Sequence, residues 1–327
     1  MSDREHDGPS NSERGHEARW PSHIPARGWK DIAWRVWREI AEDRILLIAA
    51  GVTYYLLLAL FPALGAFVSL YGLFADPATV SDHIALLEGV LPSEAITIIE
   101  QQLDSLARQD QQSLGIGFAI GLAIALWSTN GGVKSLFEAM NVAYDETEKR
   151  GFVRLNLVSL AFALGAILIM IGFILIIGII PAVLAYLNLD RGAERMIELL
   201  RWPVLLIIIL AGVVLLYRFG PSRARAKWRW LSWGAVFSTL VWLGASWAFG
   251  FYLQNFANYN ATYGSLGTII GLMVWIWISV TVLIMGAEIN AEIEHQTKQD
   301  STIGAPRPMG ERGAFVADTV GDPADKK

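Results

Sequence analysis

The sequence predicts an all-α protein: a polytopic membrane helical bundle of six transmembrane helices, with both termini in the cytoplasm. Of the 327 residues, 54% are hydrophobic and only 17% are charged, whereas soluble chains carry about a quarter charged residues. The mean hydropathy is +0.40. The apolar residues are also gathered into long uncharged blocks, and about 20 residues of helix cross the hydrocarbon core of a membrane.

Six apolar blocks define the predicted spans, at residues 45–74, 114–133, 155–189, 202–219, 231–253 and 264–287. The first and third are longer than one crossing requires. Each contains a proline, Pro62 and Pro181 respectively. We therefore expect kinks, tilt or helix ends beyond the bilayer in these two spans.

The predicted orientation depends on Lys and Arg residues near the span ends, because positive residues are retained on the cytoplasmic side. They are concentrated before the first span, between the second and third, and between the fourth and fifth. The last of these segments contains Arg223, Arg225, Lys227 and Arg229. The sequence therefore predicts a multi-pass membrane protein with cytoplasmic termini.

The membrane domain is expected to cover residues 29–295, between disordered cytoplasmic tails at 1–28 and 296–327. Both tails are polar, and the first lacks the apolar region of a signal peptide. An external loop at 76–113 is acidic, and its second half has the period of an amphipathic helix. This helix lies on the outer rim of the membrane in one interpretation and docks a partner in the other.

The second span is the strongest candidate for a functional site. Its purely apolar part, residues 114–127, would be only about 21 Å long as a helix, which is short of the roughly 30 Å hydrocarbon core. The polar residues that follow must complete the crossing, and the Gly131-Gly132 pair is expected to weaken the helix at that depth.

On a continuing helix, five polar residues would share one face: Asn130, Lys134, Glu138, Asn141 and Asp145. Apolar residues would occupy the opposite face: Val133, Leu136, Phe137, Met140 and Tyr144. One interpretation is a surface helix whose polar stripe contacts water. The other is a cytoplasm-facing cavity lined by the stripe, because polar groups inside a membrane usually face such a cavity.

The last span ends in VLIMGAEINAEIE, residues 282–294, where Glu288 falls at the predicted membrane boundary and Glu292 and Glu294 lie beyond it. Glutamates at a helix C-terminus are disfavoured by the helix dipole, so the helix should continue or find cationic partners. One interpretation is a collar of exposed ion pairs, each worth under about 1 kcal/mol. The other is a functional carboxylate at Glu288 that binds a proton or a substrate.

An enzymatic function is not expected. The chain has no cysteine, its five histidines have no metal-ligand spacing, and no catalytic or nucleotide-binding motif is present. The acids at 145, 146 and 148 precede Lys149 and Arg150, as in an ion-paired turn. No cofactor, metal or nucleic-acid partner is predicted. The expected partners are membrane lipids, with envelope proteins or a second copy of the chain as further candidates.

Three blocks resemble the BrkB/YihY family of bacterial inner-membrane proteins: residues 49–74, 126–152 and 263–292, the last containing YGSLGTIIGLMVWIWISVTVLIMGAEINAE. The resemblance implies a six-helix integral protein of the bacterial plasma membrane and carries no catalytic residues with it. The family has borne ribonuclease and virulence-factor labels and a suspected role in moving envelope lipids. The positions that match it are Tyr54, Pro62, Asn130, Asn141, Tyr263, Gly264, Gly286, Glu288 and Asn290.

Two functions are consistent with these observations. The first is a transporter or flippase-like protein for an amphipathic or anionic envelope substrate. Its candidate site residues are Asn130, Lys134, Glu138, Asn141, Glu288, Asn290 and Tyr54, supported by the structural residues Pro62, Gly131, Gly132, Pro181, Gly264 and Gly286. The second is a membrane scaffold that organises envelope partners and transports nothing. The short, glycine-interrupted second span favours the transporter.

Overall fold

The computed structural model of the chain describes residues 13–74, 111–174, 176, 191–255 and 266–324. Within these ranges every regular element is a helix and there is no β-strand, which confirms the predicted all-α class. The helices are η1 (Pro21–His23), α1 (Ala26–Glu42), α2 (Ile45–Phe74), α5 (Gln111–Ala143), α6 (Phe152–Ile174), α8 (Arg191–Phe219), α9 (Trp228–Asn255), α11 (Leu266–His295) and α12 (Phe315–Asp318).

A long helix occupies the position of each predicted span, and α2 has the same bounds as the first one. Within the described ranges, four helices are long and apolar enough to cross a membrane: α6, α8, α9 and α11. A fifth candidate is the pair formed by α1 and the first part of α2, which is bent by 59° at the break between them. The chain is therefore an integral membrane protein with several apolar spans.

The structure describes some of the positions where the sequence predicts kinks or a weakened helix. α5 runs without interruption through Gly131 and Gly132. A Cβ at Gly132 would lie 3.0 Å from the Leu56 side chain of α2, so this glycine allows α2 and α5 to approach closely. Pro62 lies within the bounds of α2. Pro181, Tyr263 and Gly264 lie outside the described residues, as does the predicted external loop up to Gln111, where α5 begins.

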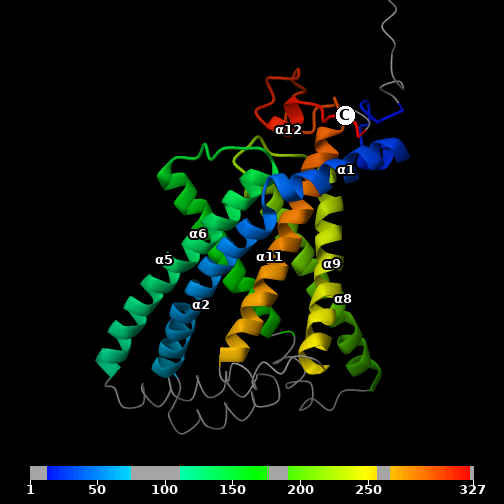
Figure 1. The fold of residues 1–327 in the computed structure, drawn as a ribbon. Coiled ribbons are helices and arrows are strands. Elements are labelled where there is room, and N and C mark those ends of the chain that lie inside the picture. The colour runs from blue at the N-terminus through cyan, green and yellow to red at the C-terminus, as the bar shows by residue number, and fades with distance from the viewer. Residues whose placement is uncertain (1–12, 75–110, 175, 177–190, 256–265, 325–327) are drawn as a thin grey trace, which may run out of the picture.

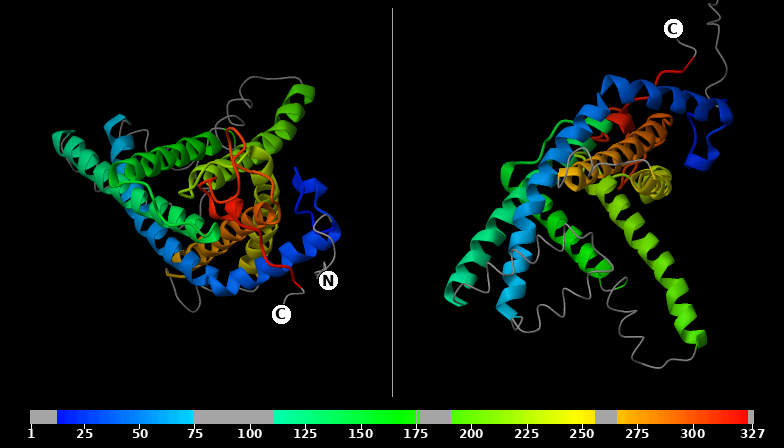
Figure 2. Two further views of the ribbon diagram at one scale, coloured as in Figure 1. Left: turned by 90° about the horizontal axis from the view of Figure 1, so that it is seen from above. Right: turned by 60° about the horizontal axis from the view of Figure 1, so that its bottom comes forward.

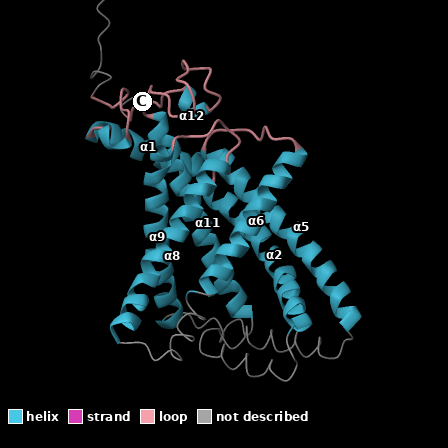
Figure 3. Ribbon diagram, turned by 180° about the vertical axis from the view of Figure 1, so that it is seen from behind, coloured by secondary structure: helices cyan, strands magenta, loops and turns pink. Residues whose placement is uncertain are grey.

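The long helices stand side by side, with α11 between α2 and α9 (Figure 1). α2 packs along α5, α6 packs on α5, and α8 packs on α9. α1 lies across one end of this bundle, as the view from above shows (Figure 2). The C-terminal segment and α12 lie at the same end of the bundle as α1, next to the loops that connect the long helices, as the view from behind in Figure 3 shows.

Hydrogen bonds join the segments at this end. The Lys149 N–H donates to Ser222 Oγ at 2.9 Å, which links the α5–α6 connection to the α8–α9 connection. The α8–α9 connection in turn donates from the Ala224 N–H to the Gly313 carbonyl, at 3.0 Å. One end of the bundle therefore holds both connections that the sequence predicts to be cytoplasmic, namely α5–α6 and α8–α9. The N-terminal region and the C-terminal segment lie at the same end.

Large apolar side chains cover the outside of the bundle away from this end. Ile207 of α8 is 64% exposed and Trp247 of α9 is 75% exposed. Such an apolar exterior over long helices is the surface that contacts lipid. The buried core contains the residues predicted for the apolar face of α5, including Phe137 and Met140, which are fully buried.

Glycine also sets the contact between α9 and α11. A Cβ at Gly234 of α9 would overlap the Gly286 carbonyl of α11, and a Cβ at Gly286 would overlap Ser238 and Tyr217. Asn290 fixes the same contact, because its Oδ1 accepts from the Gly234 N–H at 2.8 Å and its Nδ2 donates to the Leu231 carbonyl at 3.1 Å. Gly286 and Asn290 are therefore packing residues of the α9–α11 interface.

The C-terminal segment is not the disordered tail that its composition predicts. Val316 and Ala317 of α12 are buried, and Thr302 forms a β-bridge with Ala226 of the α8–α9 connection. The Arg312 guanidinium donates to the carbonyl groups of Ala317 and Lys298. The prediction is wrong for residues 296–324 because their polar groups bond to the exposed ends of the helices rather than to water.

The same correction applies to residues 13–28 at the N-terminus. Gln296 Nε2 donates to the Arg14 carbonyl at 2.8 Å, and the Thr297 hydroxyl donates to the Ala18 carbonyl at 2.8 Å. Arg14 forms a buried ion pair with Asp31 of α1 at 2.8 Å. Residues 1–12 of the predicted tail lie outside the described residues.

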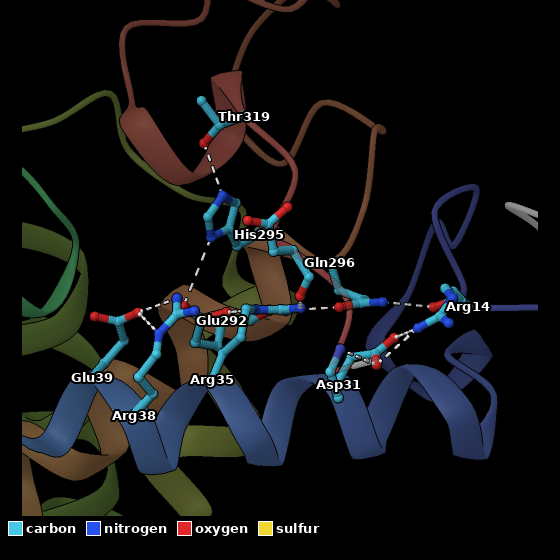
Figure 4. A network of polar contacts seen from close by, with 11 residues as sticks. Arg14, Asp31, Arg35, Arg38, Glu39, Glu292, His295, Gln296 and Thr319 are labelled. Atoms are coloured by element: carbon cyan, nitrogen blue, oxygen red, sulfur yellow. Dashed lines mark hydrogen bonds and ion pairs between the residues drawn. The ribbon is translucent and has the colours of Figure 1, made fainter. Parts of the chain in front are cut away.

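Buried ion pairs hold the C-terminal end of α11 (Figure 4). Arg35 of α1 is 1% exposed; it pairs with Glu292 and also donates to Gln296 Oε1 at 2.7 Å and to the Asp322 carbonyl at 3.0 Å. Arg223 of the α8–α9 connection pairs with Glu294 at 2.6 Å, and both of these side chains are buried. The predicted cationic partners are present, but the collar is buried rather than exposed, because α1 and the C-terminal segment cover it.

We predict that Arg35→Met destabilises the folded protein by about 3–5 kcal/mol, because it leaves the buried Glu292 carboxylate without its cation. The matched control is Arg38→Met on the same helix, where a 37% exposed side chain pairs with Glu39 at 2.8 Å. That change should cost under about 1 kcal/mol. Denaturant unfolding in detergent micelles measures both, and equal losses would contradict the assigned role of Arg35.

Candidate functional site

Four polar side chains meet between α5 and α6, and we call this group the α5–α6 polar patch: Asn130 and Lys134 of α5 with Asn156 and Ser159 of α6. Asn130 Nδ2 donates to Asn156 Oδ1 at 2.8 Å, and Lys134 Nζ donates to the same oxygen at 2.6 Å. The Ser159 hydroxyl donates to Asn130 Oδ1. The structure thus brings together two residues predicted from the sequence and two that were not.

Helix geometry explains why these four side chains meet. Asn130 and Lys134 are one turn apart on α5, and Asn156 and Ser159 are three residues apart on α6, so each pair lies on one face of its helix. The α6 pair is also held near its own backbone: Asn156 Nδ2 donates to the Phe152 carbonyl at 2.6 Å. Ser159 Oγ lies 2.8 Å from the Leu155 carbonyl, which shares the single hydroxyl proton of Ser159 with Asn130 Oδ1. These bonds fix the orientation of the α6 side chains toward α5.

Lys134 carries the charge of the patch. Its ammonium group has no carboxylate within ion-pair distance in the described part of the chain, and Glu138, one turn further along α5, is exposed. Its other contact is the Phe152 ring, whose centroid lies 5.7 Å from Nζ and whose side chain is 78% exposed. Lys134 itself is half-buried. It is therefore a cation at the edge of an apolar surface, bonded to an amide oxygen rather than to a carboxylate.

The remainder of the predicted polar stripe on α5 has a different role. Asn141 is buried; its Oδ1 accepts from the Ser222 N–H at 2.7 Å and its Nδ2 donates to Glu148 at 3.2 Å. It therefore joins the end of α5 to the two connections beside it. Asn141 is not part of the patch. It lies one turn beyond the exposed Glu138 on α5, where this face of the helix is buried against other segments.

The turn after α5 is ion-paired as predicted. Lys149 pairs with Glu146 and Arg150 pairs with Glu148, each at 2.6 Å. Burial alone would raise the pKa of Glu148, but hydrogen bonds from Arg150 and Asn141 lower the pKa to about 2. Arg150 also donates to the Phe219 and Gly220 carbonyls, at 3.0 and 2.8 Å. The acids of this turn therefore serve as structural anions.

Two further candidates lie away from the patch. Tyr54 is 59% exposed on α2, with its ring in edge contact with Tyr55 at a centroid distance of 5.6 Å. Glu288 lies in α11 and is 2% exposed. The charged groups near it, such as Asp43, do not belong to the patch. No group of three or more His, Asp or Glu side chains in the described ranges is arranged to hold a metal ion.

Sequence reasoning missed Asn156 and Ser159. They fall at the start of the third predicted span, and they are its first two polar residues. Their spacing of three on an otherwise apolar helix was the signal that could have identified them, because polar groups at that depth require partners on a neighbouring helix. Which helix supplies those partners depends on the packing of α6 against α5.

Comparison with known proteins covers all of the helices that build the patch. Residues 36–309 match the family model described as Virulence factor BrkB. The ribonuclease-like protein YfkH of Bacillus subtilis is 32% identical over 256 residues, which are 76% of this chain and 90% of that protein. A UPF0761 membrane protein of Idiomarina loihiensis is 26% identical over 220 residues, covering 66% of this chain and 73% of its own. No solved structure matches the chain.

Proposed function

This chain belongs to the Virulence factor BrkB family, and we propose that it is a transporter of the flippase type, which moves an anionic, amphipathic envelope substrate along the α5–α6 polar patch. It is a multi-pass protein of the bacterial inner membrane, as its apolar helices and its UPF0761 membrane protein relatives indicate. The proposal concerns what the chain does in that membrane.

The observation that carries the proposal is Lys134. A half-buried ammonium on a membrane helix, with no carboxylate beside it among the described residues, is costly unless an anion or water accompanies it. A phosphate or carboxylate headgroup would supply that anion, and Asn130, Asn156 and Ser159 would supply hydrogen-bonding groups for the rest of a polar head. Amide and hydroxyl groups suit this role because each can donate as well as accept.

Exposed apolar side chains of α5 and α6 could contact the apolar part of such a substrate. Trp127 is 78% exposed on α5 and lies two turns from Lys134 on the same helix face. Leu157 of α6 is 63% exposed. The extensive packing of α6 in the described ranges is with α5. A separation of α6 from α5 would open the patch to a headgroup, and it would have to loosen the contact between the Phe137 and Phe162 rings, whose centroids are 5.1 Å apart.

The experiment is transport of a fluorescent phosphatidylglycerol in liposomes that contain the purified protein, with dithionite quenching used to follow lipid movement between leaflets. We expect the protein to accelerate movement. Lys134→Gln should slow it about tenfold, because a hydrogen bond to a charged group contributes about 1.5–3 kcal/mol. Lys149→Gln is the matched control, because its exposed ammonium group pairs with Glu146 away from the patch.

An unaccelerated rate with wild-type protein, or equal rates for Lys134→Gln and wild type, would count against the flippase. The scaffold interpretation would then be the better account of this chain. The two variants differ only in which lysine loses its charge, so a loss of activity in both would indicate a general effect of charge on the protein or the vesicles.

We further propose that six helices span the membrane, namely α2, α5, α6, α8, α9 and α11, and that both termini face the cytoplasm. The connections between α5 and α6 and between α8 and α9 support this orientation, because they lie at the end of the bundle that holds the terminal segments and they carry Lys149, Arg150, Arg223 and Arg225. Positive residues are enriched on the cytoplasmic side of membrane proteins.

Single cysteines test the orientation, because the chain contains none. A membrane-impermeant maleimide should label Arg225→Cys in inside-out vesicles and leave it unlabelled in intact spheroplasts, where Asn258→Cys should react. Arg225 is exposed in the structure, so its reagent access depends only on the side of the membrane. Labelling of Arg225→Cys in intact spheroplasts would contradict the proposed orientation.

We also propose that the chain is not an enzyme, although one relative is named ribonuclease-like. Glu146 and Glu148 are held by Lys149 and Arg150 and so are poorly placed to bind a catalytic metal. Protein purified free of contaminating nuclease should not cleave RNA with Mg²⁺ or Mn²⁺. Cleavage that persists through purification and disappears in Asp145→Ala, but not in the exposed control Glu138→Ala, would refute this.

A further inference from the structure

Glu288 is a buried acid for which the described residues supply no cation. It is 2% exposed in α11, and its Oε1 has no hydrogen-bond partner in the described part of the chain. The two glutamates that follow it on the same helix are different, because Glu292 pairs with Arg35 and Glu294 pairs with Arg223. A buried carboxylate without a cation is strongly disfavoured, so something else must compensate the Glu288 charge.

The side chain that faces Glu288 is another acid. Asp43 lies in the break between α1 and α2, and its carboxyl group lies beside that of Glu288, close enough to interact with it directly. The bend holds Asp43 in this position: its N–H donates to the Glu39 carbonyl at 2.9 Å, and Arg44 has a φ of 53°, in the left-handed region. The Arg44 side chain is exposed and so does not cover the pair.

The other charged groups around this pair are mostly acidic. They come from three elements: Glu39 and Glu42 from α1, Tyr144 and Asp145 from the end of α5, and Glu292 and His295 from α11. Arg38 of α1 forms ion pairs with Glu39 and Glu42. Arg35 and His295 face Glu292 (Figure 4). The cations near the pair are therefore already engaged with other carboxylates.

Two adjacent carboxyl groups can form a hydrogen bond to each other only when one of them is protonated, because ionised carboxylates only accept. Two carboxylates that share a site cannot both ionise readily, and one of them then holds its proton to an unusually high pH. Burial raises the pKa of Asp43 to about 6, and the charges of Glu39, Asp145 and Glu42 add to the effect against the opposing hydrogen bond with Glu288. The direction agrees with the geometry.

We infer that Asp43 and Glu288 form a proton-binding site, in which the two carboxyl groups hold one proton between them at the junction of α1, α2 and α11. Loss of the proton would leave two carboxylates in contact, and their repulsion would act on the packing of the α1–α2 bend against α11. Proton binding does not depend on the transport activity. If the chain transports a substrate, as proposed above, this pair is where a proton gradient would act.

The inference fixes the sign of a pH effect on stability. The unfolded chain releases both carboxyl protons near their ordinary pKa values, about 4. The folded pair still holds one proton above that pH, so the folded state binds more protons than the unfolded state. Stability therefore falls as pH rises, from about pH 4 until the shared proton is lost, with a slope that corresponds to about one proton.

The experiment measures unfolding of the purified full-length protein in detergent between pH 5 and 8.5, for wild type, Glu288→Gln, Asp43→Asn and Glu138→Gln. In the first two variants an amide replaces one carboxyl group and donates the hydrogen bond that the proton provided. Both should lose about one proton of pH dependence relative to wild type, and at pH 8 they should be at least as stable as wild type. Glu138 is exposed on α5, so its variant should keep the wild-type slope.

Infrared spectroscopy provides a second measurement that does not depend on the variants folding equally well. At pH 5 the wild-type spectrum should contain the C=O stretching band of a buried, protonated carboxyl group. This band should be missing from the spectra of Glu288→Gln and Asp43→Asn. The inference is overturned if wild type lacks the band, or if Glu288→Gln keeps the wild-type pH slope. A sodium ion between the two carboxylates would show as a missing band together with sodium-dependent stability, which also overturns it.

Discussion

The negative charge that α11 carries into packed protein is the constraint on which this end of the molecule depends. Glu288, Glu292 and Glu294 lie at the C-terminal end of the helix, where the helix dipole already concentrates negative potential, and all three are buried. Burial of three carboxylates is tolerated only when each is compensated. Arg35 compensates Glu292 and Arg223 compensates Glu294, and the positions of these arginines determine where α1 and the α8–α9 connection lie.

The terminal segments follow from the same constraint. Residues 13–28 and 296–324 shield the ion pairs from water and supply carbonyl groups to the arginines, as the Asp322 carbonyl does for Arg35. A buried pair is sensitive to the loss of either partner, so the segments that exclude water contribute to the stability of the whole bundle. The result is a firmly held platform at one end of helices whose other surfaces face lipid.

The α5–α6 polar patch stands apart from this platform. Its groups bond across one helix pair, and hydrogen bonds between membrane helices are individually modest, about 0.6 kcal/mol on average. The α5–α6 contact combines such bonds with the ring contact of Phe137 and Phe162, whereas a buried ion pair joins α1 to α11. Lys134 therefore lies where hydrogen bonds and ring packing join two helices, and the paired glutamates lie where buried ion pairs join α11 to its neighbours.

The sequence by itself determined the helical class, the positions of the long apolar helices and the apolar face of α5, because these follow from hydrophobic length and helix period alone. It also identified Asn130 and Lys134, since polar residues on a short apolar span are costly wherever they lie. Only the tertiary structure decided that Asn156 and Ser159 complete the patch, and that Asn141 and Asn290 are structural. The polar tail compositions and the predicted exposed collar were misleading for the same physical reason: the energy of a polar or charged group depends on its partners and on the water around it, and folding brings those partners from distant parts of the chain.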